Sequence, residues 1–367
     1  MKISAIDVYR VPLTSHETYY MSDGKTCATV DTMVIKVSTD VGIVGWGEVC
    51  PIPHYLPAYA NGVIPVIAEL EEVLIGADPR GAESLIRRCD WALQDHRYAK
   101  SALDIAFWDI TAKAADMPLH ALLGGKLVDT VLTYHSITCT DPARMADIAR
   151  EHLGDGIRQF QVKIGSDDNW QRDVERIAAV REAVGDEPIV YADWNGGTTP
   201  VEAIQVGHAV KDLQVMLEEP CGSIPANAEV RRNTLLPMKL DESAHDTRSL
   251  LDGSAAGCMD VVALKLSKFG GLSALRRARD LCLHLKTKMV IEDTWGSDIA
   301  TAAAVHLAMT VPPKFVFNVC DLSGYVSPHI ATDGPLRNNG ELTIGDAPGL
   351  GISIDESALG EAELRLR

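Results

Sequence analysis

Short apolar runs alternate with longer amphipathic stretches along the chain after residue 130. Each run begins roughly 22–30 residues after the one before, and the runs read QFQVKIG, PIVYADWN, VMLEEP, PMKLDES, DVVALKLSK and KMVIEDTWG. The stretch after the first run places Trp170, Val174, Ile177 and Val184 near one face of a helix that ends at Gly185. Short strands that alternate with helices predict parallel βα units, and six in succession favour a closed barrel over an open sheet.

The first part of the chain has a different pattern. The segments KISAIDVYRVP, TMVIKVST and GIVGWGEVC predict an antiparallel meander, and two or three helices follow as far as HALLGGKL. We therefore expect an α+β domain over residues 1–125 and a (β/α) barrel over 126–320. Residues 321–367 should contain the last barrel segment and a tail that packs back on the first domain.

Composition indicates which binding partners to exclude and in which compartment the protein is expected. The formal charge of −17 argues against a nucleic-acid partner or an anionic membrane. The sequence has no run of about 18 apolar residues, and its N-terminus alternates instead of forming the apolar core of a signal peptide. Eight cysteines are scattered singly without a CxxC motif, which indicates reduced thiols in a cytoplasmic protein.

Three acidic residues stand where consecutive apolar runs end. Asp193, Glu218 and Asp241 are about 25 residues apart. Neighbouring strands of a parallel barrel would bring these side chains together at its C-terminal mouth, where barrel enzymes keep their chemistry. Any one of them is equally well explained as a cap of the following helix. Three in register favour a site for a hard cation, Mg²⁺ or Mn²⁺, because clustered carboxylates otherwise repel one another.

Two lysines flank this acidic series. Lys163 precedes it in QVKIG, and Lys265 follows it in VALKLSK. A single lysine at a strand end is usually a surface charge, but these two would face each other across a bound substrate. A lysine beside a divalent cation has a depressed pKa and can serve as a base near neutral pH.

These motifs carry a resemblance to a known family. KSALDIAFWDITAK, LLGG, VKIG, ADWN, EEP, LDES and LKLSKFGG resemble, in this order, the enolase superfamily, muconate lactonizing enzyme subgroup, over the whole chain. The resemblance implies an α/β fold, a modified TIM barrel of (β/α)7β type with an N-terminal α+β capping domain that the C-terminal tail completes. It also implies family members' usual homo-oligomeric assembly.

The resemblance assigns roles to individual residues. Asp193, Glu218 and Asp241 are similar to the family's Mg²⁺ ligands, and Lys163 and Lys265 to its acid/base lysines; Glu219 occupies a variable position. The residues expected around the ligands are Gln161, Asn195, Glu242 and Lys268. The subgroup usually has Lys-x-Lys on the second barrel strand, and here the first position is Gln161. The missing charge should raise the pKa of the remaining lysine, Lys163.

The implied chemistry is removal of the α-proton of a carboxylate substrate, with Mg²⁺ stabilising the enediolate. Return of the proton to the other face gives epimerisation, and loss of a β-substituent gives elimination. Candidate substrate contacts are His54, Tyr55, Tyr59, Asp293, Trp295 and Asp321. An acid and an indole at the mouth could hold a cationic nitrogen, although a turn Asp and a packed Trp are nearly as good an explanation.

The combination of Gln161-x-Lys163, DTWG and an aromatic cap loop looks most like the proline-analogue enzymes of the subgroup. We expect dehydration of cis-3-hydroxy-L-proline or 2-epimerisation of proline analogues, including proline betaines. Dipeptide epimerases carry Asp-x-Asp at the eighth strand, where this chain has Asp321-Leu322-Ser323. Three further candidate functions are a cycloisomerase, an enzyme similar to o-succinylbenzoate synthase, and a non-catalytic barrel that binds a metal or metabolite.

Overall fold

The computed structural model describes residues 1–167 and 169–367. The N-terminal alternation forms an antiparallel sheet of β1 (Ile3–Tyr20), β2 (Thr26–Thr39) and β3 (Val44–Val49). The helices after it are α1 (Val63–Glu69), α2 (Glu71–Leu74), α3 (Ala82–Ala92), α4 (Arg97–Ala114) and α5 (Leu119–Leu122). The sequence predicts two or three helices here and the structure has five, of which α2 and α5 are only four residues long. Short 3-10 turns lie at Ser22–Gly24, Ala60–Gly62, Leu322–Tyr325 and Glu356–Ala358.

Helix α4 is buried along nearly its whole length and packs on β3. Two glycines of β3 allow the backbones to approach each other. A Cβ atom on Gly47 would lie 1.8 Å from the carbonyl oxygen of Ala102, and one on Gly45 would lie 2.3 Å from that of Ala106. The WGEV segment therefore fits directly against α4, which fixes the sheet of the cap on its helical layer.

The apolar runs after residue 130 form an eight-stranded sheet in which every neighbouring pair is parallel. Its strands, in chain order, are β5 (His135–Ile137), β6 (Gln159–Lys163), β7 (Ile189–Asp193), β8 (Val215–Glu218), β9 (Met238–Leu240), β10 (Val261–Lys265), β11 (Lys288–Glu292) and β12 (Val316–Val319). A parallel bridge between Thr133 and Val319 joins the first strand to the last. The expected closed barrel is confirmed.

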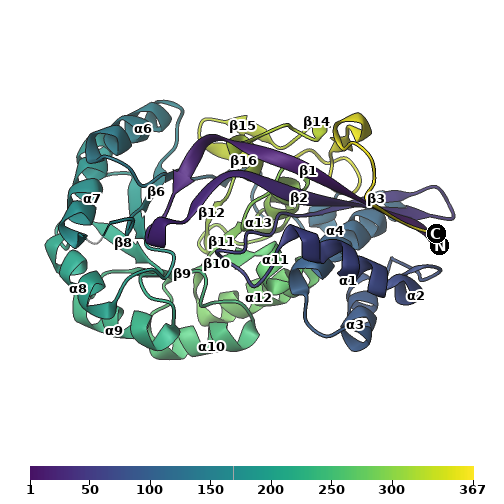
Figure 1. The fold of residues 1–367 in the computed structure, drawn as a ribbon, viewed down its shortest axis with the longest axis horizontal. Helices are drawn as coiled ribbons and strands as arrows, with labels where there is room; N and C mark the ends of the chain where they lie inside the picture. Colours follow the sequence, from purple (N-terminus) through teal and green to yellow (C-terminus); the bar gives the residue numbers. More distant parts are fainter. Residues whose placement is uncertain (168) are drawn as a thin grey trace.

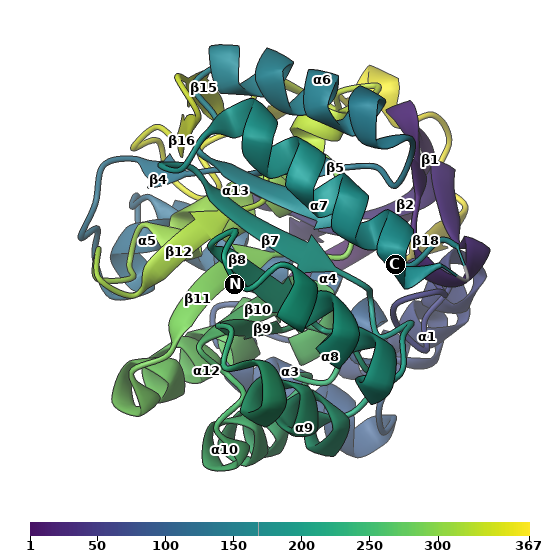
Figure 2. The same ribbon diagram turned by 90° about the vertical axis from the view of Figure 1, so that its left-hand side faces the viewer.

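Helices lie between successive strands and surround the barrel (Figure 2). They are α6 (Pro142–Gly154), α7 (Trp170–Val184), α8 (Pro200–Ala209), α9 (Ile224–Thr234), α10 (Thr247–Ala256), α11 (Leu266–Phe269), α12 (Leu272–Leu285) and α13 (Asp298–Ala308). Because no further helix of the barrel follows β12 in the described chain, the arrangement is (β/α)7β. Gly185 ends α7 with a φ of 76°, as its sequence predicts, and Thr199 and Glu202 form a capping box at α8.

The C-terminal tail returns to the cap (Figure 1). β13 (Val326–Ser327) and β18 (Leu364–Leu366) both pair with β1, so the two chain termini lie close together. The remaining short strands are β4 (Val131–Leu132), β14 (Ala331–Asp333), β15 (Leu336–Asn338), β16 (Glu341–Thr343) and β17 (Ser353–Ile354). The last barrel strand spans Val316–Val319, so it lies before residues 321–367, where it was expected from the sequence.

No helix in the described part of the chain combines the length and the apolar character needed to cross a membrane. All eight cysteines are buried and free.

Candidate active site

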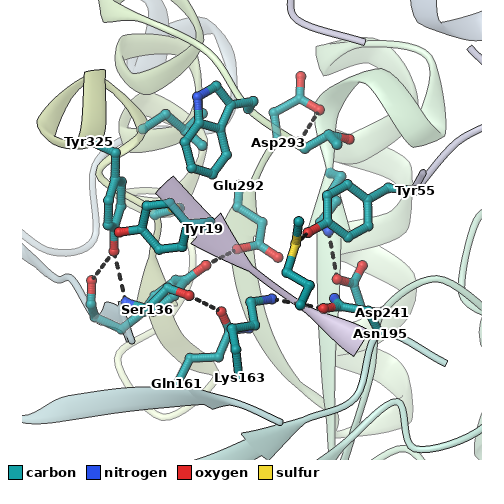
Figure 3. A pocket seen from close by; sticks show the side chains of 17 residues that line it. Tyr19, Tyr55, Ser136, Gln161, Lys163, Asn195, Asp241, Glu292, Asp293 and Tyr325 are labelled. Atoms are coloured by element: carbon teal, nitrogen blue, oxygen red, sulfur yellow. Dashed lines mark hydrogen bonds and ion pairs between the residues drawn. The ribbon is translucent and has the colours of Figure 1, made fainter. Parts of the chain in front are cut away.

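The carboxyl ends of the barrel strands surround a cavity of about 50 Å³ that the cap covers (Figure 3). The tip of the β1–β2 hairpin rests on the loops after β6 and β7. There the amide of Asp23 donates to the carbonyl of Gly165, and a Cβ atom on Gly197 would lie 2.5 Å from Oγ of Ser22. Met21 and Tyr55 therefore line the cavity from the cap side.

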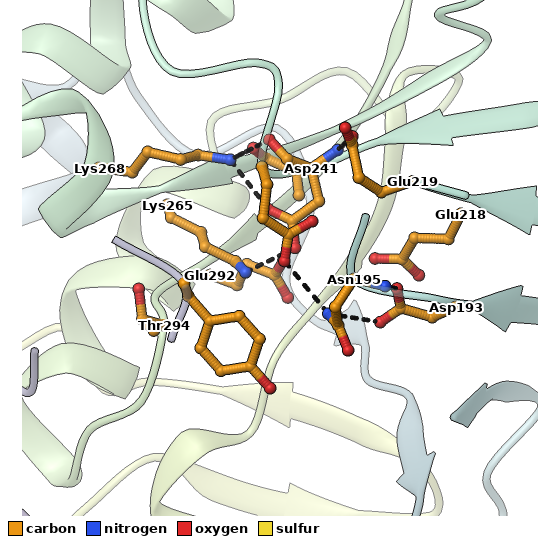
Figure 4. Close-up of polar contacts among 12 residues, drawn as sticks. Asp193, Asn195, Glu218, Glu219, Asp241, Lys265, Lys268, Glu292 and Thr294 are labelled. Carbon is orange, nitrogen blue, oxygen red and sulfur yellow. Dashed lines mark hydrogen bonds and ion pairs between the residues drawn. The ribbon is translucent and has the colours of Figure 1, made fainter. Parts of the chain in front are cut away.

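Asp193, Glu218 and Asp241 are brought together at this end of the barrel (Figure 4). Asp193 and Glu218 are direct partners on β7 and β8, and Asp241 follows the adjacent β9. Each of the three residues is at most 2% exposed. Burial, followed by the charge of Asp193, raises the pKa of Glu218 to about 8. The lysines beside Asp241 outweigh its burial and hold its pKa well below the usual range.

Each of these carboxylates is turned toward an ammonium group. The closest ion pairs are Lys163–Asp193 at 2.5 Å, Lys239–Glu218 at 2.9 Å, Lys265–Asp241 at 2.6 Å and Lys268–Asp241 at 2.9 Å. In this arrangement, no three His, Cys, Asp or Glu side chains of the described residues are gathered as a ready metal cluster. The three carboxylates share one end of the barrel, with their oxygens directed at lysines.

Lys163 and Lys265 lie on opposite sides of the cavity. β6 and β10 are four strands apart in a barrel of eight, and both side chains line the cavity. Burial opposes the charge of Lys163, but Asp193, Tyr55 and Glu218 raise its pKa above the usual value. Burial is likewise outweighed at Lys265, whose pKa Asp241 raises well above the usual value. The direction is opposite to that expected for a lysine beside a cation, because the nearest charges are carboxylates.

The residues expected around the ligands are found there: Gln161, Asn195, Glu242 and Lys268. Asn195 donates from Nδ2 to Asp193 and to Glu242, at 3.1 Å each. Burial, followed by the charge of Asp241, raises the pKa of Glu242 to about 7.

Glu219 has a structural role instead of facing the cavity. Its carboxylate accepts from the amide of Asp241 at 2.7 Å, from both the amide and the hydroxyl of Ser243, and from Asn227. Glu219 therefore fixes the turn after β9. Of the two adjacent acids, Glu218 is the one that remains available for contacts in the site.

The expected substrate contacts are only partly brought together. Tyr55, Asp293 and Trp295 line the cavity, whereas His54 and Tyr59 are exposed and do not. Asp321 also lies outside it. Its carboxylate forms two short hydrogen bonds with Arg337, at 2.6 and 2.7 Å, and caps the following turn.

This geometry argues against Asp321 as a substrate contact, because an acid that already pairs with arginine outside the cavity has no free charge to offer a substrate. Asp293 faces the cavity, but its oxygens accept from Ser267 and from the amide of Thr294. Burial raises the pKa of Asp293 to about 6.

Several cavity residues were not identified from the sequence. Glu292 is 2% exposed, and one of its oxygens accepts from the hydroxyl of Tyr134 at 2.7 Å. It is the direct partner of Lys265 across β10 and β11. The signal that could have identified Glu292 is its position opposite Lys265 on the neighbouring strand. The sequence pattern instead favoured the adjacent acid, Asp293.

An aromatic wall was predicted only in part: Trp295 was a candidate contact, but Tyr19 and Tyr325 come from distant segments and were not identified. The rings of Tyr19 and Trp295 are 5.5 Å apart, those of Tyr19 and Tyr325 are 5.7 Å apart, and those of Trp295 and Tyr325 are 5.9 Å apart. Figure 3 shows Tyr19 and Tyr325 on the side of the cavity away from Asp241.

Comparison with known proteins agrees with the fold. The family described as mandelate racemase/muconate lactonizing enzyme, N-terminal domain, matches residues 5–124, and the family described as enolase C-terminal domain-like matches residues 144–358. A cis-3-hydroxy-L-proline dehydratase from Roseibium aggregatum is 41% identical over 100% of both chains. An N-succinyl-L-Arg/Lys racemase from Bacillus cereus is 28% identical over 98% of both.

Solved structures give the same result. A mandelate racemase/muconate lactonizing enzyme from Roseovarius nubinhibens is 34% identical, with a TM-score of 0.95 over 99% of this chain and 98% of that one. A structure from the same organism in complex with magnesium is 31% identical, with a TM-score of 0.95 over 100% of both chains. The chain therefore belongs to the mandelate racemase/muconate lactonizing enzyme family of the enolase superfamily.

Proposed function

We propose that the protein is a Mg²⁺-dependent enzyme that removes the α-proton of a small cyclic amino acid and dehydrates cis-3-hydroxy-L-proline. The observation that carries the proposal is a pair of lysines, Lys163 and Lys265, on opposite sides of a small cavity that also holds the buried acid Glu292. The full-length relative from Roseibium aggregatum, which is named for this reaction, supports the choice of substrate.

Asp193, Glu218 and Asp241 are the proposed metal ligands. Their oxygen-only donor set suits Mg²⁺, with Mn²⁺ able to substitute. Oε1 of Glu218 is buried, and the one positive group close to it among the described residues is the ammonium of Lys239 at 2.9 Å, so this oxygen stands where a cation is already favoured. When bound, Mg²⁺ would neutralise these carboxylates and stabilise the second negative charge that a carboxylate substrate gains as its α-proton leaves.

The two lysines suit an elimination across opposite faces of the substrate. In the cis isomer, the C3 hydroxyl and the carboxylate share one face of the ring, so the C2 hydrogen lies on the other face. One lysine, as the neutral amine, accepts that proton, and the other, as the ammonium, donates a proton to the departing hydroxyl. The products are water and a ring with a C2=C3 double bond, which tautomerises to the cyclic imine.

Glu292 is the proposed acceptor for the substrate's ammonium group. It faces the cavity, and among the described residues its one hydrogen bond is the one that Oε2 accepts from Tyr134. A cationic nitrogen in a site that excludes water needs such an acceptor. Asp321, which is paired with Arg337, cannot supply it.

A second candidate is 2-epimerisation of proline analogues, including betaines. The same lysines would serve, and the aromatic wall of Tyr19, Trp295 and Tyr325 is suited to a quaternary ammonium group. A non-catalytic barrel would not require two opposed lysines.

The test is NMR in D₂O with Mg²⁺-loaded protein and four substrates: cis-3-hydroxy-L-proline, its trans isomer, L-proline and L-proline betaine. We expect the cis isomer to give the cyclic imine, and the trans isomer to react much more slowly, because its C2 hydrogen and hydroxyl share a face. Turnover of the betaine alone would favour the epimerase. Turnover restricted to nitrogen-free acids, or full activity after chelator treatment, would contradict the proposal.

A further inference from the structure

Lys239 is a fully buried lysine that the proposed reaction does not use. It lies on β9 with no exposed surface, and it does not line the cavity. Its ammonium is 2.9 Å from Oε1 of Glu218 and stands over the rings of Tyr134 and Tyr191, at 5.5 and 5.0 Å from their centres. Among the described residues, Glu218 is the one carboxylate that forms an ion pair with Lys239.

Glu218 is held from two sides. Gln161 donates from Nε2 to Oε2 at 2.9 Å, and Lys239, its direct neighbour across β8 and β9, lies beside Oε1. Gln161 is itself fixed by the hydroxyl of Ser136 at 2.8 Å. The two contacts differ in one respect: Gln161 is neutral, and Lys239 carries the charge.

The other buried lysines of the site are committed elsewhere. Lys163 pairs with Asp193, and Lys265 and Lys268 pair with Asp241. Lys163 and Lys265 must also exchange protons with a substrate, so neither provides a permanent charge. Lys239 is out of reach of a substrate, which leaves it available as a fixed countercharge.

We propose that Lys239 is a positioning residue that supplies a permanent positive charge behind Glu218 and so keeps the carboxylate site assembled when no metal is bound. The inference rests on the proposed function, in which Glu218 is a metal ligand. In the metal-free protein, Lys239 compensates a buried carboxylate. A bound cation would take over that compensation, and the ammonium would then repel it.

The metal-free and the Mg²⁺-bound protein should therefore respond differently to loss of the charge of Lys239. Lys239→Met keeps the length of the side chain and removes its charge. We expect the Tm of the metal-free variant, measured in EDTA, to fall much further than its Tm in saturating Mg²⁺. The rise in Tm that Mg²⁺ produces should thus be larger in the variant than in the wild-type protein.

A second variant tests charge against packing. Gln161→Lys would place an ammonium next to the other oxygen of Glu218. We expect it to raise the metal-free Tm of Lys239→Met toward the wild-type value, and to give no increase in the protein that retains Lys239. If Lys239→Met alone does not accumulate as folded protein, the soluble yield of the double variant decides, because recovery requires a role for the charge.

Equal losses of Tm with and without Mg²⁺, or no recovery in the double variant, would show that Lys239 only fills space and would overturn the inference. Absence of any Mg²⁺-dependent rise in the wild-type protein would instead overturn the proposed metal site.

Discussion

At the scale of single residues, the site is a set of compensating buried charges. Four lysines, each at most 7% exposed, face the three carboxylates at the ends of β7, β8 and β9. Substitution of one member of a buried pair leaves its partner uncompensated. Variants here therefore need an assay that separates chemistry from folding.

The two cavity lysines should differ by the face of the substrate they serve. Lys163→Ala and Lys265→Ala should each lose dehydration and epimerisation by about 10²–10⁴-fold. One of them should still exchange the α-proton of one enantiomer with solvent, because the remaining lysine reaches a single face. NMR in D₂O with both enantiomers measures this. Equal exchange of both enantiomers by either variant would be incompatible with the arrangement across the cavity.

Glu292 should decide whether the substrate is an amino acid. Glu292→Gln keeps an acceptor for Tyr134 but removes the charge that would pair with the substrate's nitrogen. Loss of such a pair costs about 2–5 kcal/mol. That is a fall in kcat/KM of roughly 30- to several-thousand-fold.

Asp321→Asn is the matched control, because Asp321 lies outside the cavity and pairs with Arg337. It should keep nearly wild-type kcat/KM. Both variants should retain the stabilisation that Mg²⁺ gives. Wild-type turnover of a cyclic amino acid by Glu292→Gln would remove Glu292 from the site.

At the scale of elements, a carboxylate of β3 is one of the contacts that join the cap to the barrel. Glu48 is completely buried, and it accepts from the amide and hydroxyl of Ser297 and from the amide of Ala300, at 2.7–2.8 Å. It also accepts from Thr32 at 2.8 Å. Glu48, a residue of the capping domain, therefore satisfies amide groups at the N-terminus of α13. This helix end lies two residues beyond Trp295 of the aromatic wall.

Glu48→Ala should leave those buried donors without an acceptor. We expect the free energy of unfolding to fall by about 2–4 kcal/mol. KM should also rise, because the loop that holds Trp295 loses its anchor. Denaturant unfolding and steady-state kinetics measure the two effects. Glu356→Ala, which removes an exposed pair with Lys36, should change stability by less than about 1 kcal/mol and leave KM unaltered.

At the scale of the whole molecule, buried acids of α4 hold the cap, the barrel and the tail together. Asp109 accepts from the amides of Trp46 in the cap and Leu350 in the tail, at 3.0 and 2.8 Å. Asp104 accepts from the amide and the hydroxyl of Ser273 at the start of α12, at 2.8 and 2.5 Å. These contacts make α4 the common support of all three parts.

Asp104 should make stability depend on pH. Burial raises its pKa to about 7, so the folded protein binds this proton more tightly than the unfolded chain. Its contribution to stability is therefore complete below about pH 4 and is lost as pH rises through about 7, at roughly 1.4 kcal/mol for each unit of pKa shift.

At low pH, Asp104→Asn should be less stable than the wild type, because its amide nitrogen faces hydrogen-bond donors. The difference in stability between the two proteins should shrink as pH rises and should no longer change with pH above about 7. Urea unfolding of both proteins between pH 4 and 8 measures this. A constant difference in stability over that range would show that Asp104 is ionised throughout.

Local pattern was sufficient to predict the barrel, its parallel order and the five charged residues at its mouth. An apolar run of about five residues followed by an amphipathic helix leaves few other arrangements, and parallel strands place their carboxyl ends at one edge. Asp193, Glu218 and Asp241 were identifiable because each ends such a run. Lys163 and Lys265 were identifiable because they flank the series on opposite sides.

Tertiary structure alone decided which side chains share the cavity and which charges are already paired. Tyr19, Trp295 and Tyr325 meet only because the β1–β2 hairpin folds over the barrel and the tail returns beside it. Asp321 pairs with Arg337, a residue 16 positions away, and Asp293 accepts from Ser267, 26 positions away, which leaves Glu292 as the acid proposed for the substrate's nitrogen. The pattern along a chain records which face of an element is buried. Electrostatic compensation depends on distances between segments, which exist only in the folded protein.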